Sequence, residues 1–229
     1  KMEKTFHIQW HITDRCNLRC RHCYQETYRK QNELPLEEIQ KVFFNISNFV
    51  KGRGQKLVLD ITGGEPFLYK GWKEIIHLTG QSDIIKELGI ITNGFFLTPE
   101  NIEFLGNLKT FTSIKISAEG ITKPSYEYYR GKNTYGRFII GCEVLKTSLP
   151  KVKKFLMFTL TKKNADMVPG LFDFIKYYNL DGFIIERFIP WGVGRAIKET
   201  VVSLEEWKNV LKTLCEKTGV DPDISTLIP

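Results

Sequence analysis

The chain has 229 residues, of which 42% are apolar and 26% are charged, as expected for a globular protein with a substantial core. No apolar run approaches the roughly 20 residues of a membrane span, and the N-terminal stretch does not read as a signal peptide, so we expect a cytoplasmic chain without a membrane partner. The formal net charge of +7 is spread along the sequence without the basic aromatic platforms that read nucleic acid, which argues against a nucleic-acid partner.

Short apolar segments alternate with helix-like segments along the chain. The sequence predicts strands over 6–13, 56–62, 89–92, 111–117, 153–160 and 182–189. It predicts helices over 35–50, 71–88, 99–107, 135–149, 168–178 and 204–218, with Thr98 and Ser203 as N-caps. Six successive strand–helix units favour an α/β fold with parallel strands and right-handed crossovers, either open or curled into a barrel.

The loop after the first strand contains three of the five cysteines, Cys16, Cys20 and Cys23. They are too close together to pair well as disulfides. A structural zinc site usually has a fourth Cys or His ligand, and adding His22 would still leave an unusual ligand set, so zinc stays the less favoured alternative. The spacing suits an iron–sulfur cubane, in which three thiolates on four irons leave one iron open to a ligand. We expect the other two thiols, Cys142 and Cys215, to be core residues, because both lie at helical spacing with apolar neighbours.

The next three predicted strands each end in a distinctive motif. "GGEP" (63–66) follows the second strand, "TNG" (92–94) the third and "SAEG" (117–120) the fourth. Because the carboxyl ends of parallel strands meet on one rim, these loops and the cysteine loop should converge there. The sequence therefore predicts an active site at the C-terminal rim of the strands.

Taken in order, "CNLRCRHCY" (16–24), "GGEP", "TNG" and "SAEG" resemble the motifs of the radical S-adenosylmethionine (radical SAM) superfamily. The resemblance is strongest to the branch that carries a cysteine-rich C-terminal domain, the SPASM or twitch type, which includes peptide maturases. It extends from residue 6 to about residue 195. It implies a partial (β/α)6 TIM-like barrel, a [4Fe–4S] cluster and bound SAM. We expect residues 1–200 to form this core, and 201–229 its last helix and the start of a linker toward an auxiliary-cluster domain that is absent from the sequence.

By this resemblance, Cys16, Cys20 and Cys23 bind the cluster. The resemblance also implies that SAM is contacted by His22, Tyr24, Thr62, Gly63, Gly64, Glu65, Thr92, Asn93, Ser117 and Arg130. The glycines and Glu65 would meet the amino group of the methionine, through backbone carbonyls and through the Glu65 carboxylate. A side chain added at Gly64 should then collide with SAM and leave the cluster in place.

Other positions of the implied site have narrower roles. His22 and Tyr24 would lie near the adenine, and short polar side chains such as Ser117 near the ribose or the carboxylate. Arg130 would pair with the SAM carboxylate, with Arg137 as the competing candidate. Glu119 stands where many members of the family have Asp.

The family's chemistry implies that a low-potential donor such as flavodoxin or ferredoxin reduces the cluster. SAM is then cleaved to a 5′-deoxyadenosyl radical that abstracts a substrate hydrogen. The resemblance to the SPASM branch implies a peptide or protein substrate. Maturation of a small-molecule cofactor or haem, or tRNA modification, is the alternative within enzymes, and a non-catalytic iron–sulfur or zinc protein is the alternative outside them.

Polar residues inside the predicted barrel are candidates for handling the substrate. On the first strand His7, Gln9 and His11 alternate with apolar residues, and the polar face is expected to look inward. Asp60 and Glu186 are the candidates for a substrate contact or a proton acceptor, although both could instead belong to satisfied polar layers.

Overall fold

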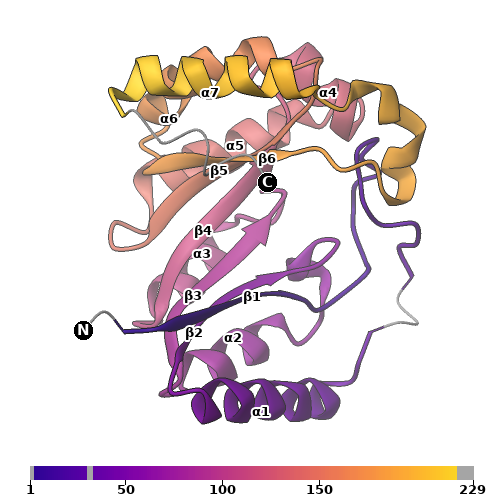
Figure 1. The fold of residues 1–229 in the computed structure, drawn as a ribbon. Coiled ribbons are helices and arrows are strands. Elements are labelled where there is room, and N and C mark those ends of the chain that lie inside the picture. Colours follow the sequence, from indigo (N-terminus) through magenta and orange to yellow (C-terminus); the bar gives the residue numbers. More distant parts are fainter. Residues whose placement is uncertain (1–2, 30–32, 221–229) are drawn as a thin grey trace.

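The computed structural model describes residues 3–29 and 33–220. Its centre is a parallel sheet of six strands in the order β1-β2-β3-β4-β5-β6. The strands are β1 (Thr5–His11), β2 (Lys56–Thr62), β3 (Ile85–Thr92), β4 (Phe111–Ala118), β5 (Lys153–Leu160) and β6 (Gly182–Arg187). Figure 1 shows them as a strongly curved sheet with helices around its outer side, so the predicted partial barrel is confirmed.

The helices that connect the strands cover the convex face of the sheet and enclose the hydrophobic core with it. They are α1 (Leu36–Gly52), α2 (Trp72–Gly80), α3 (Pro99–Gly106), α4 (Lys123–Arg130), α5 (Tyr135–Thr147), α6 (Val168–Tyr177) and α7 (Leu204–Thr218). Short 3-10 helices add η2 (Pro66–Leu68), η3 (Ala165–Met167) and η4 (Gly192–Thr200). Both predicted N-caps are present, since the side chain of Thr98 accepts from Asn101 N and that of Ser203 from Glu206 N.

One helix prediction is wrong, and one helix of the structure was not predicted. The helix predicted over 71–88 ends at Gly80, and β3 already begins at Ile85. The turn-forming residues between these points stop the helix, and the segment after them joins the sheet. Helix α4 was not predicted at all, although Pro124 in its first turn and a capping box from Thr122 mark its start.

The two faces of β1 have different environments, as the alternation of its residues predicts. Phe6, Ile8 and Trp10 pack against the hydrophobic core, where Trp10 stacks on Phe43 of α1 at 6.4 Å between ring centroids. The polar residues of β1 therefore face the concave side of the sheet. This concave side is the interior of the half-barrel, and it carries the site.

Helix α7 is the last element of the described chain and packs beside α6. The predicted division into a core over 1–200 and a following segment over 201–229 stays a prediction, and its linker over 221–229 lies outside the described residues. Among the described helices none is both long and apolar enough to cross a membrane.

Candidate active site

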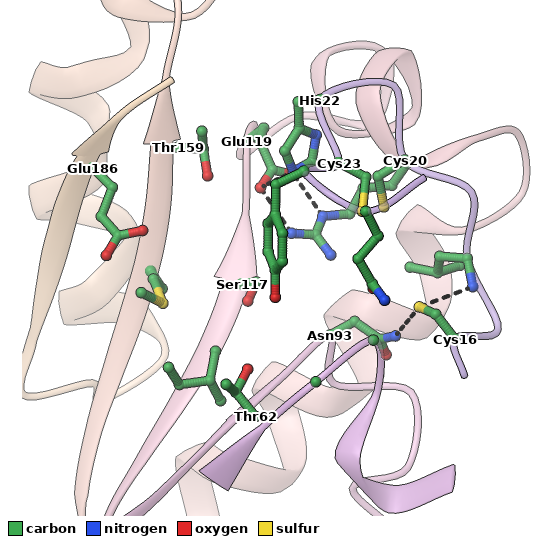
Figure 2. Close-up of a pocket in the computed structure, with 18 of the residues that line it drawn as sticks. Cys16, Cys20, His22, Cys23, Thr62, Asn93, Ser117, Glu119, Thr159 and Glu186 are labelled. Carbon is green, nitrogen blue, oxygen red and sulfur yellow. Dashed lines mark hydrogen bonds and ion pairs between the residues drawn. The ribbon is translucent and has the colours of Figure 1, made fainter. Parts of the chain in front are cut away.

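The carboxyl ends of the strands surround a cavity of about 470 Å³ inside the half-barrel (Figure 2). The sequence-predicted site residues that line it are Cys16, Cys20, His22, Cys23, Tyr24, Thr62, Gly63, Gly64, Thr92, Asn93, Ser117, Arg130 and Glu186. Glu65 and Asp60 do not line it. The four motifs that were expected to converge on one rim therefore do so.

The three thiols of the cysteine loop lie at the edge of this cavity. Burial raises the pKa of Cys16 and raises the pKa of Cys20 to about 12, so ionised thiolates there need a positive partner. Iron–sulfur irons supply such charge, and a cubane takes one thiolate on each of three irons, so the thiols need not converge on one point. The donor set fits a cluster.

Backbone contacts to two other segments, the end of α4 and η4, fix the cysteine loop. Arg21 N donates to Tyr129 O at the end of α4 at 2.8 Å, and Gly194 N of η4 donates to Cys23 O at 2.9 Å. Two N–H groups also point at Cys16 Sγ, from Leu18 N at 3.4 Å and from Asn93 Nδ2 at 3.9 Å. Hydrogen bonds to sulfur of this kind hold a thiolate ligand and influence a cluster's potential.

The "GGEP" loop is packed directly against the backbone of the cysteine loop. Gly64 N donates to Thr13 O and Glu65 N to Arg15 O, both at 2.7 Å. A Cβ on Gly64 would lie 2.7 Å from the carbonyl carbon of Arg15, and no backbone atom there can move aside cheaply. The expectation that a side chain at Gly64 would disturb SAM alone is therefore wrong, because it would first displace the cysteine loop.

The Glu65 carboxylate is buried and bonded within the protein. It accepts from Thr92 Oγ1 at 2.9 Å and from Asn93 N at 2.8 Å, and it caps η2 through Phe67 N at 3.4 Å. Burial raises the pKa of Glu65 to about 7, against the lowering effect of these three donors. The carboxylate thus ties the loop after β2 to the loop after β3, which leaves the glycine backbone as the part of this motif that faces the cavity.

A buried ion pair stands where β4 ends. Arg130, the last residue of α4, donates to Glu119 from Nε at 2.5 Å and from Nη2 at 2.8 Å. His22 Nε2 approaches the same carboxylate at 3.1 Å. Burial would raise the pKa of Glu119, but the neighbouring Arg130 and His22 outweigh it and hold this pKa at about 2. Arg137, the competing candidate, is exposed and donates to Phe95 O instead.

The two candidate carboxylates for substrate handling have different surroundings. Asp60 is 1% exposed and is paired with His7 Nε2 at 2.8 Å and with Lys115 Nζ, below the cavity. Glu186 points from β6 into the cavity, across from the cysteine loop (Figure 2). Glu186 is exposed toward the cavity, and partial desolvation there raises its pKa, with Lys115 acting in the opposite direction.

Several lining residues were not singled out from the sequence. Met157 and Thr159 of β5 line the cavity, and Ile189 and Trp191 stand at its mouth. The period of two along β5 places Met157 and Thr159 on one face and was the available signal. Ile189 and Trp191 follow β6 in an irregular segment, where no periodicity of the sequence indicates which way a side chain points.

A half-barrel of parallel strands with three thiols and a glycine loop on its C-terminal rim defines a class of cofactor-dependent enzymes. Residues 10–175 match the model of the radical SAM superfamily, and the chain belongs to that superfamily. Its members use a [4Fe–4S] cluster and SAM, and the predicted family, enzyme class and cofactors are confirmed. The non-catalytic iron–sulfur or zinc protein is thereby set aside.

Curated relatives have different named activities. The chain is 24% identical over 213 residues to Fe-coproporphyrin III synthase of Methanosarcina barkeri, covering 92% of this chain and 51% of the relative. It is 28% identical over 141 residues to the antilisterial bacteriocin subtilosin biosynthesis protein AlbA of Bacillus subtilis, covering 61% and 30%. A GTP 3′,8-cyclase of Shewanella denitrificans is 26% identical over 193 residues, covering 84% and 56%. The chain thus spans about half the length or less of these relatives.

Solved structures share the fold. Streptococcus suis SuiB bound to the precursor peptide SuiA superposes with a TM-score of 0.77 at 17% identity, covering 94% of this chain and 46% of SuiB. The structure of anSMEcpe with bound AdoMet and the Kp18Cys peptide gives a TM-score of 0.74 at 17% identity, covering 93% and 59%. At this identity the likeness shows the fold alone.

Proposed function

We propose that this radical SAM enzyme abstracts a hydrogen atom from a peptide or protein substrate in a post-translational modification. The observation that carries the proposal is one cavity that is lined by the three thiols, the glycine loop and Glu186 of β6. When bound, the cluster and SAM supply a 5′-deoxyadenosyl radical as the hydrogen-abstracting group. The protein itself holds the cluster and SAM, orients the substrate and encloses the reacting groups.

The residues have separate tasks in this proposal. The thiols of Cys16, Cys20 and Cys23 hold the cluster, and the backbone of Gly63 and Gly64 receives the methionine amino group. Arg130 pairs with the methionine carboxylate. The adenine of SAM lies toward the cysteine loop, near His22 and Tyr24. The ribose or the carboxylate contacts short polar side chains, which are Thr62, Thr92, Asn93 and Ser117.

A large substrate is supported by the shape and surface of the site. Three apolar side chains around the cavity are more than half exposed, namely Tyr24 at 55%, Ile189 at 63% and Trp191 at 65%. Exposed aromatic and aliphatic groups beside a cavity are suited to a peptide chain. Glu186 would meet a donor group of that substrate or accept its proton. The names of AlbA and of SuiB with its precursor peptide give independent support for a peptide.

A small-molecule cofactor or haem precursor is the second candidate substrate. It is favoured by the names of other relatives, Fe-coproporphyrin III synthase and GTP 3′,8-cyclase. We further propose that a flavodoxin or ferredoxin of low potential reduces the cluster, and that the reaction takes place in the cytoplasm.

The substrate class can be tested with anaerobically reconstituted protein and a chemical reductant. SAM is supplied together with a precursor peptide, with Fe-coproporphyrin III or with GTP, and 5′-deoxyadenosine is quantified by liquid chromatography. The proposal expects the peptide, labelled with deuterium, to transfer label into 5′-deoxyadenosine. If only GTP or the porphyrin transferred label or stimulated the formation of 5′-deoxyadenosine, the proposed substrate would be that small molecule and not a peptide.

A further inference from the structure

Glu119 connects the cysteine loop to the end of α4 through one buried carboxylate (Figure 2). Its Oε1 faces both His22 Nε2, at 3.1 Å, and Arg130 Nη2, at 2.8 Å, while its Oε2 accepts from Arg130 Nε at 2.5 Å. The side chains of Glu119, Arg130 and His22 are 1%, 6% and 13% exposed. Water therefore competes little for these contacts, and their geometry is set by the protein.

The backbone of Glu119 is held in place by the side chain of Asn164. The buried Asn164 side chain donates from Nδ2 to Glu119 O and to Thr159 O, each at 2.9 Å. On the other side, Arg21 N donates to Tyr129 O at 2.8 Å, beside Arg130. The cysteine loop and the end of α4 are thus joined twice, once by backbone and once through Glu119.

The contacts to Glu119 determine which hydrogen-bonding groups of Arg130 and His22 remain available to a ligand. A guanidinium has five N–H donors, and the side-on pairing takes donors from Nε and Nη2, so the Nη1 group of Arg130 remains. His22 Nε2 faces the carboxylate at 3.1 Å, so Nδ1 is the ring nitrogen that remains for a ligand. Nδ1 is buried and has no hydrogen-bond partner among the described residues. Arg130 and His22 both line the cavity.

We propose that Glu119 is a positioning residue for SAM, which sets the directions of Arg130 and His22 together. The Arg130 Nη1 group is then presented to a carboxylate, and His22 Nδ1 to a polar group of the same ligand. The extra methylene that distinguishes Glu from Asp lets one carboxylate reach both partners across the gap between α4 and the cysteine loop. This inference rests on the proposed binding of SAM in the cavity.

The test measures SAM binding without turnover. Anaerobic, cluster-loaded wild-type protein, Glu119→Gln, Glu119→Asp and the control Glu127→Gln are compared by equilibrium dialysis with SAM and by the SAM-induced change in the reduced cluster's EPR signal. Glu127 lies on α4 together with Arg130, and its carboxylate accepts from Tyr135 N at 3.3 Å. We expect Glu119→Gln to keep its iron and to weaken SAM binding about tenfold or more. Glu119→Asp should recover part of the loss, and Glu127→Gln should match the wild type.

A second comparison separates positioning from direct contact. If Glu119 acts mainly through Arg130, adding Glu119→Gln to Arg130→Met should weaken SAM binding less than it does in the wild-type background. The double variant also removes both buried charges, so it keeps the test usable if Glu119→Gln alone does not fold. The inference would be overturned if Glu119→Gln weakened SAM binding as much in the Arg130→Met background as in the wild type. Unchanged SAM affinity in Glu119→Gln would also overturn it. A wild-type protein that binds its cluster but no SAM would instead overturn the proposed function.

Discussion

The thiols of this chain fall into two groups according to their surroundings. Cys16, Cys20 and Cys23 border the cavity with N–H groups aimed at one of their sulfurs, whereas Cys142 is fully buried in the hydrophobic core. Burial also raises the pKa of Cys142, so this thiol is a poor source of thiolate. The lone Cys215 on α7 is not among the residues that line the cavity.

Cys20→Ala should abolish binding of the cluster, because it removes one of the three ligands. Cys142→Ala and Cys215→Ala should keep the wild-type iron content after anaerobic reconstitution. Iron and sulfide analysis with the visible absorption spectrum measures this directly. Iron loss in either control variant would mean that the ligand set has been assigned wrongly.

Gly64→Ala should reduce iron content and SAM cleavage together. The new Cβ would press on the Arg15 carbonyl group, and relieving that contact shifts the loop that holds the cluster. Gly136→Ala is the matched control, because a Cβ at that position meets nothing within 4 Å. Normal iron in Gly64→Ala, with SAM binding lost, would show instead that the side chain meets SAM alone.

The glycine loop also shows how far single residues can be interpreted from sequence. Its motif predicts a close backbone approach at Gly64, and the structure has one. The approaching partner was not predictable, because the sequence does not tell which of several loops on the same rim touch each other. For the same reason Glu119 could be located in its motif, but its pairing with both Arg130 and His22 could not.

At the scale of secondary structure elements, the strands were predicted more accurately than the helices. The buried runs over 56–62 and 153–160 have the predicted bounds, because a continuous apolar segment between polar turns has few alternatives. Helix α4 was missed because the face it buries consists of Tyr126, Tyr129 and Arg130, which a hydrophobic pattern does not detect. This omission matters, since α4 holds Arg130 in place.

The connection between the ends of β2 and β3 should make stability depend on pH. The pKa of Glu65 rises from 4.5 to about 7 on folding, so between these values the folded chain binds more protons than the unfolded chain. The free energy of unfolding should therefore decrease as the pH rises from about 4.5 to 7, by up to about 1.4 kcal/mol per pH unit. Glu65→Gln should flatten this dependence in cluster-free protein, measured as the midpoint of urea unfolding. An equally steep dependence in the variant would exclude Glu65 as its source.

The two carboxylates on the inner strands should respond differently to loss of charge. Glu186→Gln should leave folding and substrate-free SAM cleavage intact but lower substrate-dependent hydrogen abstraction about tenfold or more. Asp60→Asn should instead destabilise the protein by about 3 kcal/mol, because it leaves Lys115 buried without its charged partner. Urea unfolding and deuterium transfer separate these effects. Unchanged hydrogen abstraction in Glu186→Gln would remove that residue from the proposed site.

Across the whole molecule, the curved sheet joins these separate features into one site. The first and last strands of the sheet, β1 and β6, both contribute to the cavity, through Gln9 and Glu186. The cluster loop lies at one end of this concave face and Glu186 on the opposite wall. A substrate that enters between them would lie against SAM, as abstraction of its hydrogen requires.

The most direct test of this account is the reductive cleavage of SAM by the reconstituted wild-type chain. With dithionite and SAM under anaerobic conditions, it should form 5′-deoxyadenosine and methionine in equal amounts, and Cys20→Ala should form neither. The products are quantified by liquid chromatography with mass detection against the iron content of each sample. A wild-type chain that carries a full cluster but releases no 5′-deoxyadenosine, or a Cys20→Ala variant as active as the wild type, would contradict the account.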